Sequence, residues 1–282
     1  MTLPSPQPSP SGRGGWLELA RHARVYDLSH PLDAAMPVSP NHPGYRMALL
    51  RRHGDMLRAD GGSAANEMLM LGGHTGTHLD ALAHVSHHGK LHGGLDAQEA
   101  QQGGRFKWLG VEAVEPLFCP GVLLDVAGFR GMPALAARAA GEPITADDLR
   151  QVAAAEGVDL PAGGAVLVRS GWACHWGDPP AYLGQTTGVP GPDVSAAEWI
   201  AAARPRVTGH DSMAYEHLPP GAGHALLPVH RVLLVEHGVH IVENLDLEQL
   251  ARDRVYQFLF VCLPLKFVGA TGSPVRPIAV VA

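Results

Sequence analysis

The segment HTGTHLDALAH at residues 74–84 constrains the fold more than any other part of this chain. Within eleven residues it carries His74, His78, Asp80 and His84. Neutral imidazoles and a carboxylate are ligands that Zn²⁺ and similar first-row ions accept, and a three-ligand set leaves one coordination position open for water or substrate. The segment therefore predicts a catalytic metal site on a backbone that can aim these side chains at one point.

The spacing of these residues indicates an extended backbone. On a single helix, Asp80 would lie about 200° around the axis from His78, so a helix could not aim both of them and His74 at one ion. On an extended segment the three side chains project from one side, and Gly76 supplies a bend that brings the two histidines together. We therefore predict that His74, His78 and Asp80 bind a metal ion.

His84 lies four residues beyond Asp80. If the chain turns helical from about Asp80, the two residues are neighbours on one helical face, which places His84 beside the metal but out of the plane of its ligands. We predict that His84 is the catalytic acid or base. The alternative role for this histidine is a hydrogen bond that orients a metal ligand.

A second concentration of histidines and acids lies between residues 210 and 243. If the chain is extended from Gly238, then Val239, Ile241 and Glu243 share one side of the strand, and the Glu243 carboxylate is buried with apolar side chains. A buried carboxylate needs a partner, which a metal ion or a buried histidine would supply. Glu236 precedes the glycine and is expected in a solvent-exposed turn.

The motif His-Thr-Gly-Thr-His-Leu-Asp at residues 74–80, followed by His84, resembles the signature of the cyclase-like metal-dependent hydrolases, a family that includes bacterial kynurenine formamidase and isatin hydrolase. The resemblance extends over nearly the whole chain. The segments that carry it are residues 26–32, 123–126, 166–172, 263–266 and 272–276. It implies a single α/β domain over residues 21–282 with the family's swivelling β/β/α fold, preceded by a loosely packed or disordered tail at residues 1–20.

The resemblance also implies the composition of the site. It makes His74, His78 and Asp80 metal ligands and His84 the catalytic histidine. In formamidases of this family a later histidine and glutamate complete a two-metal site with the aspartate bridging, and the matching residues here are His230 and Glu243. We therefore expect a divalent metal, Zn²⁺ or Mn²⁺, with one or two ions per subunit. The resemblance further implies a homodimer or homotetramer.

Two residues are predicted to contact the substrate. The formamidase pattern has a tryptophan in a Pro-x-Trp-Pro context near the start of the domain, and Ser39 stands at that position here. The loss of a flat aromatic wall removes about 0.5–1.5 kcal/mol of stacking and changes the pocket shape. Trp172 is the second predicted contact. It opens an extra segment, residues 172–192, which could reshape the pocket mouth, form a surface loop or contact another subunit.

The expected reaction is hydrolysis of a small-molecule amide, either a formamide or a cyclic amide or imide, by a metal-activated water, with His84 moving protons. Hydrolysis of a lactone or other ester is an alternative of the same class. Two further alternatives are a cyclase or dehydratase that uses the metal as a Lewis acid, and a non-catalytic metal-binding protein. A structural metal site would need a fourth ligand and no acid or base beside it.

Apolar periodicity supports an α/β domain in this chain of 282 residues. Strands are expected at residues 164–168, 232–235 and 257–265. One helix is expected to begin near Thr145, which is followed by two acidic residues. A second helix is expected to begin at Ser195, because Glu198 three residues later would complete a capping box.

Charge and composition exclude several classes of function. A net charge of −6 leaves no basic face for nucleic acid. No stretch reaches the ~18 apolar residues of a membrane span, and residues 1–15 lack the apolar core of a signal peptide. Three widely spaced cysteines are expected in a reducing cytoplasm.

Overall fold

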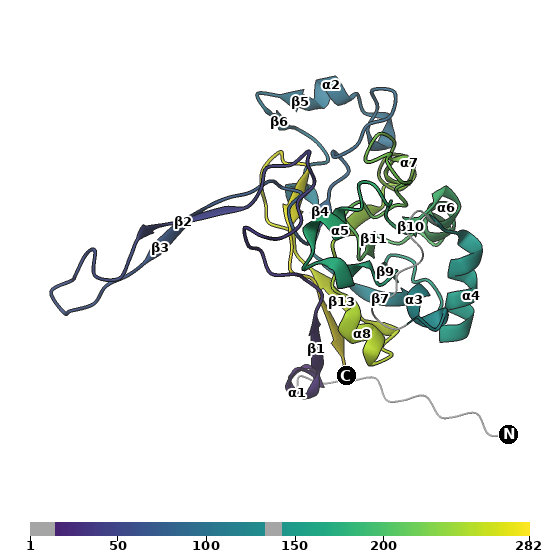
Figure 1. Ribbon diagram of the computed structural model, residues 1–282, viewed down its shortest axis with the longest axis horizontal. Coiled ribbons are helices and arrows are strands. Elements are labelled where there is room, and N and C mark those ends of the chain that lie inside the picture. The colour runs from purple at the N-terminus through teal and green to yellow at the C-terminus, as the bar shows by residue number, and fades with distance from the viewer. Residues whose placement is uncertain (1–14, 133–142) are drawn as a thin grey trace.

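The computed structural model describes residues 15–132 and 143–282, and a mixed sheet forms its centre (Figure 1). The sheet has nine strands in the order β1 (Arg24–Asp27), β15 (Ile278–Val281), β13 (Gln257–Cys262), β7 (Leu117–Asp125), β9 (Ala165–Arg169), β11 (Val207–His210), β12 (His240–Glu243), β4 (His78–Asp80) and β14 (Gly272–Pro274). Strands β7, β9, β11 and β12 run parallel, and the remaining neighbours pair antiparallel. The expected α/β architecture is confirmed.

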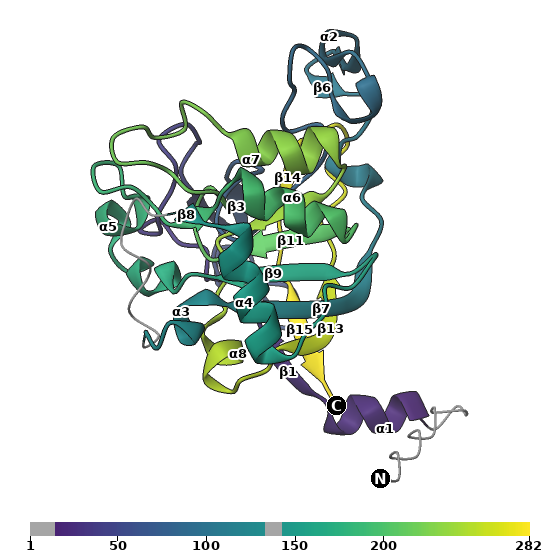
Figure 2. The same cartoon turned by 90° about the vertical axis from the view of Figure 1, so that its right-hand side faces the viewer.

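Helices cover one face of the parallel strands (Figure 2). They are α4 (Ala146–Glu156), α6 (Val194–Ala202) and α7 (Pro228–His230), which continues into the π-helical turn η4 (Arg231–Glu236). Alternate residues of β7, such as Val122 and Leu124, pack with Leu149 of α4 and Ile200 of α6. Because the central strands are buried on both faces, β9 reads as a continuous apolar run before Arg169.

The opposite face of the sheet encloses a second core. Leu79 of β4, Phe260 of β13 and Tyr26 of β1 belong to one buried cluster, although four strands separate β4 from β13 in the sheet. These residues can meet only if the sheet curls strongly, which follows from the right-handed twist of its strands. Because of this curl, the helices do not cover the whole of the face formed by β4 and β12. The predicted site residues lie at the uncovered end of that face.

The other elements are short and connect the main ones. The short helices are α1 (Gly15–His22), α2 (Ala97–Ala100), α3 (Val126–Phe129), α5 (Pro179–Leu183) and α8 (Glu248–Arg252), with 3₁₀ turns η1 (His92–Gly94), η2 (Val111–Ala113) and η3 (Trp172–His175). Two-stranded ribbons pair β5 (Gln101–Gln102) with β6 (Arg105–Phe106) and β8 (Pro143–Ile144) with β10 (Gly191–Pro192).

A long hairpin projects from the body of the molecule (Figure 1). It consists of β2 (Arg46–Arg51) and β3 (Asn66–Met70), which pair only with each other, and all residues of both strands are exposed. We call residues 46–70 the arm. Its two ends join the segments that carry Ser39 on one side and His74 on the other.

The expected helix starts are partly correct. Thr145 caps α4, with Asp148 completing a capping box. The start expected at Ser195 is wrong, because α6 begins two residues earlier and Asp193 is its cap, accepting a hydrogen bond from the Ala196 backbone. The Ser195 hydroxyl instead donates to Asp193 at 2.6 Å. An aspartate competes better than a serine for the cap because its carboxylate also interacts with the helix dipole.

The strand expected at residues 232–235 is also wrong. These residues form η4, where Val232, Leu233 and Leu234 are all buried against α6 and Val239. A short run of buried apolar residues does not distinguish a strand from a helix by periodicity alone. Pro228 at the first turn of α7 starts a helix that runs through this segment. The strands expected at residues 164–168 and 257–265 are confirmed as β9 and β13, the latter ending at Cys262.

Three further expectations concern the ends of the chain and the membrane. Residues 1–14 of the expected tail lie outside the described residues, and helix α1 spans the expected boundary at residue 20. Within residues 15–132 and 143–282, none of the helices has the length and apolarity to cross a bilayer.

Glu156 at the end of α4 provides a test of the packing between α4 and β7. Its Oε1 accepts the Asp125 amide at 3.0 Å, and burial, with the nearby Asp125 charge, raises its pKa from 4.5 to about 8. A carboxyl whose pKa is raised in the folded state binds a proton more tightly there, so the wild-type protein loses stability as pH rises from 4.5 to about 8.

We therefore expect Glu156→Gln, which keeps the acceptor and removes the charge, to be more stable than wild type above pH 8 and equal to it below pH 4.5. Allowing for partial exposure, the difference above pH 8 is about 1 kcal/mol. Thermal unfolding across this range measures it, and a pH-independent difference would contradict the assignment.

Candidate metal centre

The register of β4 places His78 and Asp80 on the open side of the sheet. Strand β4 lies between β12 and β14, with His78 opposite Glu243 and Asp80 opposite Ile241. Leu79, the residue between them, points to the other face and is fully buried there. Ile241 packs with Val239 on the helix-covered side, and Glu243, two residues on, lies on the same side, as the sequence parity predicts.

The turn at residues 74–77 brings His74 back towards Asp80. Gly76 has a φ of +61°, and a Cβ there would lie 2.2 Å from Leu32 Cδ2, so only glycine fits this bend. His74 Nδ1 lies 2.6 Å from Asp80 Oδ1, and its Nε2 lies 2.9 Å from the Thr271 hydroxyl. The expected bend at Gly76 is confirmed, but only His78–Asp80 form a strand, and His74 reaches Asp80 from the turn and not from the expected extended segment.

The orientation of the His78 ring is set by the same turn. His78 Nδ1 donates to the Gly76 carbonyl at 2.8 Å, which leaves Nε2 as the free nitrogen, 3.5 Å from both Asp80 Oδ1 and Glu243 Oε2. The Gly76 carbonyl also accepts from the Asn244 side chain, which in turn accepts from the Tyr182 hydroxyl at 2.7 Å. A second N–H held by a carbonyl is the usual way in which a metal-binding histidine is fixed in one tautomer.

His84 reaches the site by a turn, not by the expected helix. The chain after Asp80 is held by other segments, because the Ala81 amide donates to Thr271 and the Ala83 amide donates to Leu109. The segment forms only a turn, closed by His84 N and Ala81 O at 2.9 Å, because the His87 amide, which a helix would direct back to Ala83, donates to Lys90 O at 2.9 Å. The His84 ring stacks on His74 at 4.0 Å between centroids.

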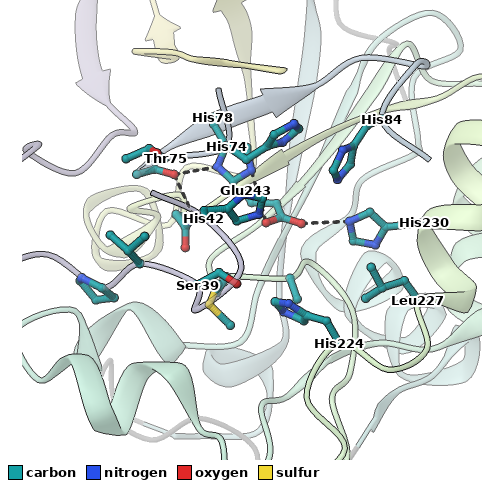
Figure 3. Close-up of a pocket in the computed structure, with 16 residues that line it drawn as sticks. Ser39, His42, His74, Thr75, His78, His84, His224, Leu227, His230 and Glu243 are labelled. Atoms are coloured by element: carbon teal, nitrogen blue, oxygen red, sulfur yellow. Dashed lines mark hydrogen bonds and ion pairs between the residues drawn. The ribbon is translucent and has the colours of Figure 1, made fainter. Parts of the chain in front are cut away.

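His230 and Glu243 face each other from α7 and β12 (Figure 3). His230 Nε2 lies 3.1 Å from Glu243 Oε1 and 3.7 Å from Asp80 Oδ2. Glu216 holds the other side of the ring, with Oε1 at 2.6 Å from Nδ1 and accepting the His230 amide at 3.0 Å. The sequence reasoning missed Glu216. The rule that a metal-binding histidine donates its second N–H to a carboxylate could have directed the search to it.

Asp80 joins the two groups of possible ligands. The donor atoms of His74, His78 and Asp80 lie within 4.8 Å of one another, and so do those of Asp80, His84 and His230. Asp80 is 1% exposed, and its Oδ2 accepts no hydrogen bond from any described residue. An orphaned carboxylate oxygen at this depth, facing imidazoles, fits a carboxylate that bridges two cations.

Burial and the neighbouring charges shift the pKa values of the groups in this cluster. Burial opposes ionisation of Asp80, but the imidazoles of His84 and His74 outweigh it and hold the pKa of Asp80 well below its usual range. Burial lowers the pKa of His78 to about 4, and burial raises the pKa of Glu243 to about 7. Burial would also lower the pKa of His230, yet its hydrogen bonds to Glu216 and Glu243 raise it to about 10. Metal binding would therefore compete with a proton on His230.

A cavity adjoins the cluster and gives access to it. Ser39, His224 and Leu227 line it on the side away from His78, and His42 lies beside His74, with 5.5 Å between the ring centroids (Figure 3). Met213 also lines it. The enclosed space is about 60 Å³. Because a cavity that holds a benzene ring measures about 150 Å³, a substrate that reaches the ligands is small or extends out through the mouth.

Ser39 lines this cavity as expected, whereas Trp172 does not. The Trp172 indole is buried and donates to the Tyr182 carbonyl at 2.8 Å, within a cluster that includes Met213 and Leu218. The expected direct contact between Trp172 and substrate is thus not present. The residue 172–192 segment instead packs behind the cavity wall, because its aromatic side chains need an apolar partner and Met213 provides one.

The sequence of this chain matches the family profile described as "Putative cyclase" over residues 26–217, more than half of its length. The chain belongs to the cyclase family. The resemblance noted in the sequence is thereby confirmed.

Two proteins and one solved structure illustrate the similarity. Cyclase-like protein 2 of Oryza sativa subsp. japonica is 27% identical over 283 residues, which cover 97% of this chain and 84% of that protein. Isatin hydrolase of Roseibium aggregatum is 25% identical over 230 residues, which cover 79% of this chain and 77% of that protein. A crystal structure of a novel cyclase aligns with a TM-score of 0.81 at 27% identity, covering 96% of this chain and 91% of that one. The chain therefore has the cyclase-family fold.

Metal analysis of three purified proteins tests the ligand assignment. We expect His78→Ala to lose all bound divalent metal, because it removes a ligand next to Asp80. We expect Glu243→Ala to lose one of two equivalents if the cluster binds two ions, and none if it binds one. Glu115→Ala is the matched control, because Glu115 is exposed and lies outside the cavity and the groups of possible metal ligands. Full metal content in His78→Ala would contradict the site.

Proposed function

We propose that this protein is a metal-dependent hydrolase of a small-molecule amide, either a formamide or a cyclic amide or imide, and that it binds one or two divalent ions. The observation that carries the proposal is the buried Asp80 carboxylate, which faces histidines on both sides, and these histidines line a cavity. The proposed ligands are His74, His78 and Asp80 for one ion and Asp80, His230 and Glu243 for a second.

The cavity favours a catalytic over a structural metal. A structural site is closed by four protein ligands, whereas a catalytic site keeps a position open to solvent or substrate. His74, His78, His230 and Glu243 all line the cavity, so a coordination position directed into it is accessible. Held by these residues, a divalent ion would supply Lewis acidity, which brings the pKa of a coordinated water towards neutrality and polarises a carbonyl.

His84 is the proposed proton carrier. It lines the same cavity, and burial, together with the charges of His74 and His230, lowers the pKa of the His84 imidazole to about 3. The imidazole is therefore neutral at pH 7 and able to accept a proton, and its low pKa makes it release that proton readily to a leaving nitrogen. The stacked His74 ring and the turn at residues 81–84 fix the position of His84, so it can serve both transfers without moving far.

The substrate class is proposed from the cavity and from one relative. The small enclosed space excludes a folded protein as substrate, and the wall carries polar groups at Ser39, His42 and His224 that can orient a carbonyl or a carboxylate. Isatin, for which the Roseibium relative is named, is a cyclic amide, and this supports the same bond type here. With Ser39 in place of an aromatic side chain, this wall offers less stacking for a flat ring.

Lactone or ester hydrolysis is the first alternative, because it needs the same ligands and proton carrier. A cyclase or dehydratase reaction is the second, and the names of the cyclase relatives favour it. Product analysis in ¹⁸O-labelled water separates these classes. We expect one labelled oxygen in the product of a formamide, cyclic imide, lactam or lactone. Turnover of a substrate without incorporation of label would contradict hydrolysis, and a product that has lost one water relative to its substrate would identify ring closure with dehydration.

His84→Ala tests the proton carrier separately from the metal. We expect kcat to fall about 10²–10⁴-fold, the usual contribution of general acid–base catalysis, while the metal content stays equal to that of wild type. His88→Ala is the matched control, because His88 is exposed and lies outside the cavity. Unchanged turnover in His84→Ala with full metal content would contradict the role, and loss of metal would identify His84 as a ligand.

A further inference from the structure

A second cavity adjoins the one that leads to the possible metal ligands, which we call the first cavity. The second cavity encloses about 290 Å³, whereas the first encloses about 60 Å³. Met213 and His224 line both of them. His224 lies on the side of the first cavity away from His78 (Figure 3). A molecule whose reacting group occupies the first cavity can therefore extend into the second, away from the ligands.

Three loops form most of the wall of the second cavity. They are residues 40–41, which directly follow Ser39 of the first cavity, residues 183–185 at the end of α5, and residues 218–224 between β11 and α7. The middle loop belongs to the extra segment at residues 172–192. This segment thus lies behind the wall of the first cavity and also contributes to the wall of the second.

Hydrogen bonds connect the three loops to one another. Val189 and Leu218 exchange backbone bonds of 2.9 and 3.0 Å, and the Gly221 amide donates to the Gln185 carbonyl at 3.1 Å. The Asn41 side chain lies 3.4 Å from His224 Nδ1 and joins the first loop to the third. The second cavity is therefore a formed part of the fold, because the loops around it are fixed relative to one another.

The wall of the second cavity is apolar and carries no formal charge. Leu183, Met213 and Leu218 supply its large apolar side chains. Among the described residues that line it there is no acid, lysine or arginine, and burial lowers the pKa of the His224 imidazole, which keeps that ring neutral at pH 7. A charged group that entered would lose water without gaining an opposite charge. The second cavity therefore fits an uncharged, mostly apolar group.

The volumes of the two cavities divide a ligand into two parts. A cavity of about 150 Å³ holds a benzene ring, so the first cavity is too small for one and the second has room for a benzyl group or an alkyl chain of several carbons. No aromatic side chain is among the described residues that line the second cavity, so the group is recognised by apolar contact and not by ring stacking.

We propose that the second cavity is a substrate subsite, and that the substrate is an amide which carries an uncharged aryl or alkyl substituent beyond its reacting carbonyl. This proposal rests on the hydrolase function proposed above. Leu183, Met213 and Leu218 are the residues that contact the substituent and determine specificity for it. Through Leu183 and Gln185, the extra segment takes part in choosing the substrate.

One ligand that spans both cavities fits the structure better than a separate ligand in each. Met213 and His224 face both spaces, so a molecule in the second cavity touches the same two side chains as a substrate in the first. A substrate held at both ends also has its carbonyl fixed relative to His84, which lines the first cavity.

Calorimetry with two ureas measures the subsite without turnover. N-methylurea and N-benzylurea keep the carbonyl of an amide, resist hydrolysis and differ only in the substituent. We expect the metal-loaded wild type to bind N-benzylurea at least about 10-fold more tightly, because even one methylene in an apolar pocket changes discrimination by about 10–200-fold. We expect N-(4-carboxybenzyl)urea to bind more weakly than N-benzylurea, since its carboxylate finds no partner. Tighter binding of the carboxylate would overturn the apolar assignment.

A matched pair of tryptophan variants locates the preference. Ala222 and Ala225 are both exposed and lie in the same loop, but only Ala222 lines the second cavity. We expect Ala222→Trp, whose indole fills the space, to lose the preference for N-benzylurea over N-methylurea. Ala225→Trp should keep the preference of wild type. Equal preference in both variants would place the benzyl group elsewhere and overturn the proposal.

Kinetics with N-methylformamide and N-benzylformamide separate the subsite from the reaction. We expect kcat/KM to be at least about 10-fold higher for the benzyl compound. Turnover of both formamides with equal kcat/KM, together with equal binding of the two ureas, would overturn the subsite and leave the hydrolase function standing. Preferential binding of N-benzylurea without turnover of any formamide, cyclic imide, lactam or lactone would support the subsite and contradict the hydrolase function.

Discussion

The buried charge of Asp80 is the constraint on which the site depends. Its carboxylate lies in the middle of the fold at 1% exposure, and such a charge persists only where opposite charges or hydrogen bonds compensate it. One oxygen faces His74 and His78, and the other faces His230. These histidines come from a turn, a strand and a helix, so three separately formed elements must arrive together. The hydrogen bonds behind them, from Glu216 and from the Gly76 carbonyl, hold their rings in place.

The topology of the sheet explains how residues far apart in sequence meet at Asp80. Strand β4 pairs antiparallel with β12, the last of the four parallel strands, and the register of this pair places His78 opposite Glu243. A slip of one residue would move His78 and Asp80 to the closed core and Leu79 to the cavity. Leu79 prevents this, because its side chain belongs to the core inside the curled sheet. The ordinary burial of one leucine thus fixes the geometry of a highly charged cluster.

The sequence was sufficient to predict the parts of the site that depend on residues close together in the chain. The shared side of His78 and Asp80 follows from strand geometry, and so does the side on which Glu243 lies, while the bend at Gly76 follows from the conformational freedom of glycine. Glu216, Asn244 and Thr271 were missed because their roles arise from hydrogen bonds between distant segments. The expected helical path to His84 was wrong for a similar reason: the His87 amide, which would have continued the helix, bonds to Lys90 instead. In the fold, the sequence could not distinguish helix from strand for short buried apolar runs, because η4 and the strands have similar composition.

The arm affects the site because ordering a segment of the chain costs conformational entropy. Fixing a residue costs about 1–2 kcal/mol of backbone entropy, and contacts must offset this cost. In the body of the protein, core packing supplies those contacts, but the arm's strands are exposed along their whole length and pair only with each other. The segments at its two ends carry Ser39 and His42 on one side and His74 on the other, which together form a wall of the cavity and part of its floor. The order of that wall therefore depends on how firmly the arm is held, and any contact that holds the arm would stabilise His42 and His74 without touching them.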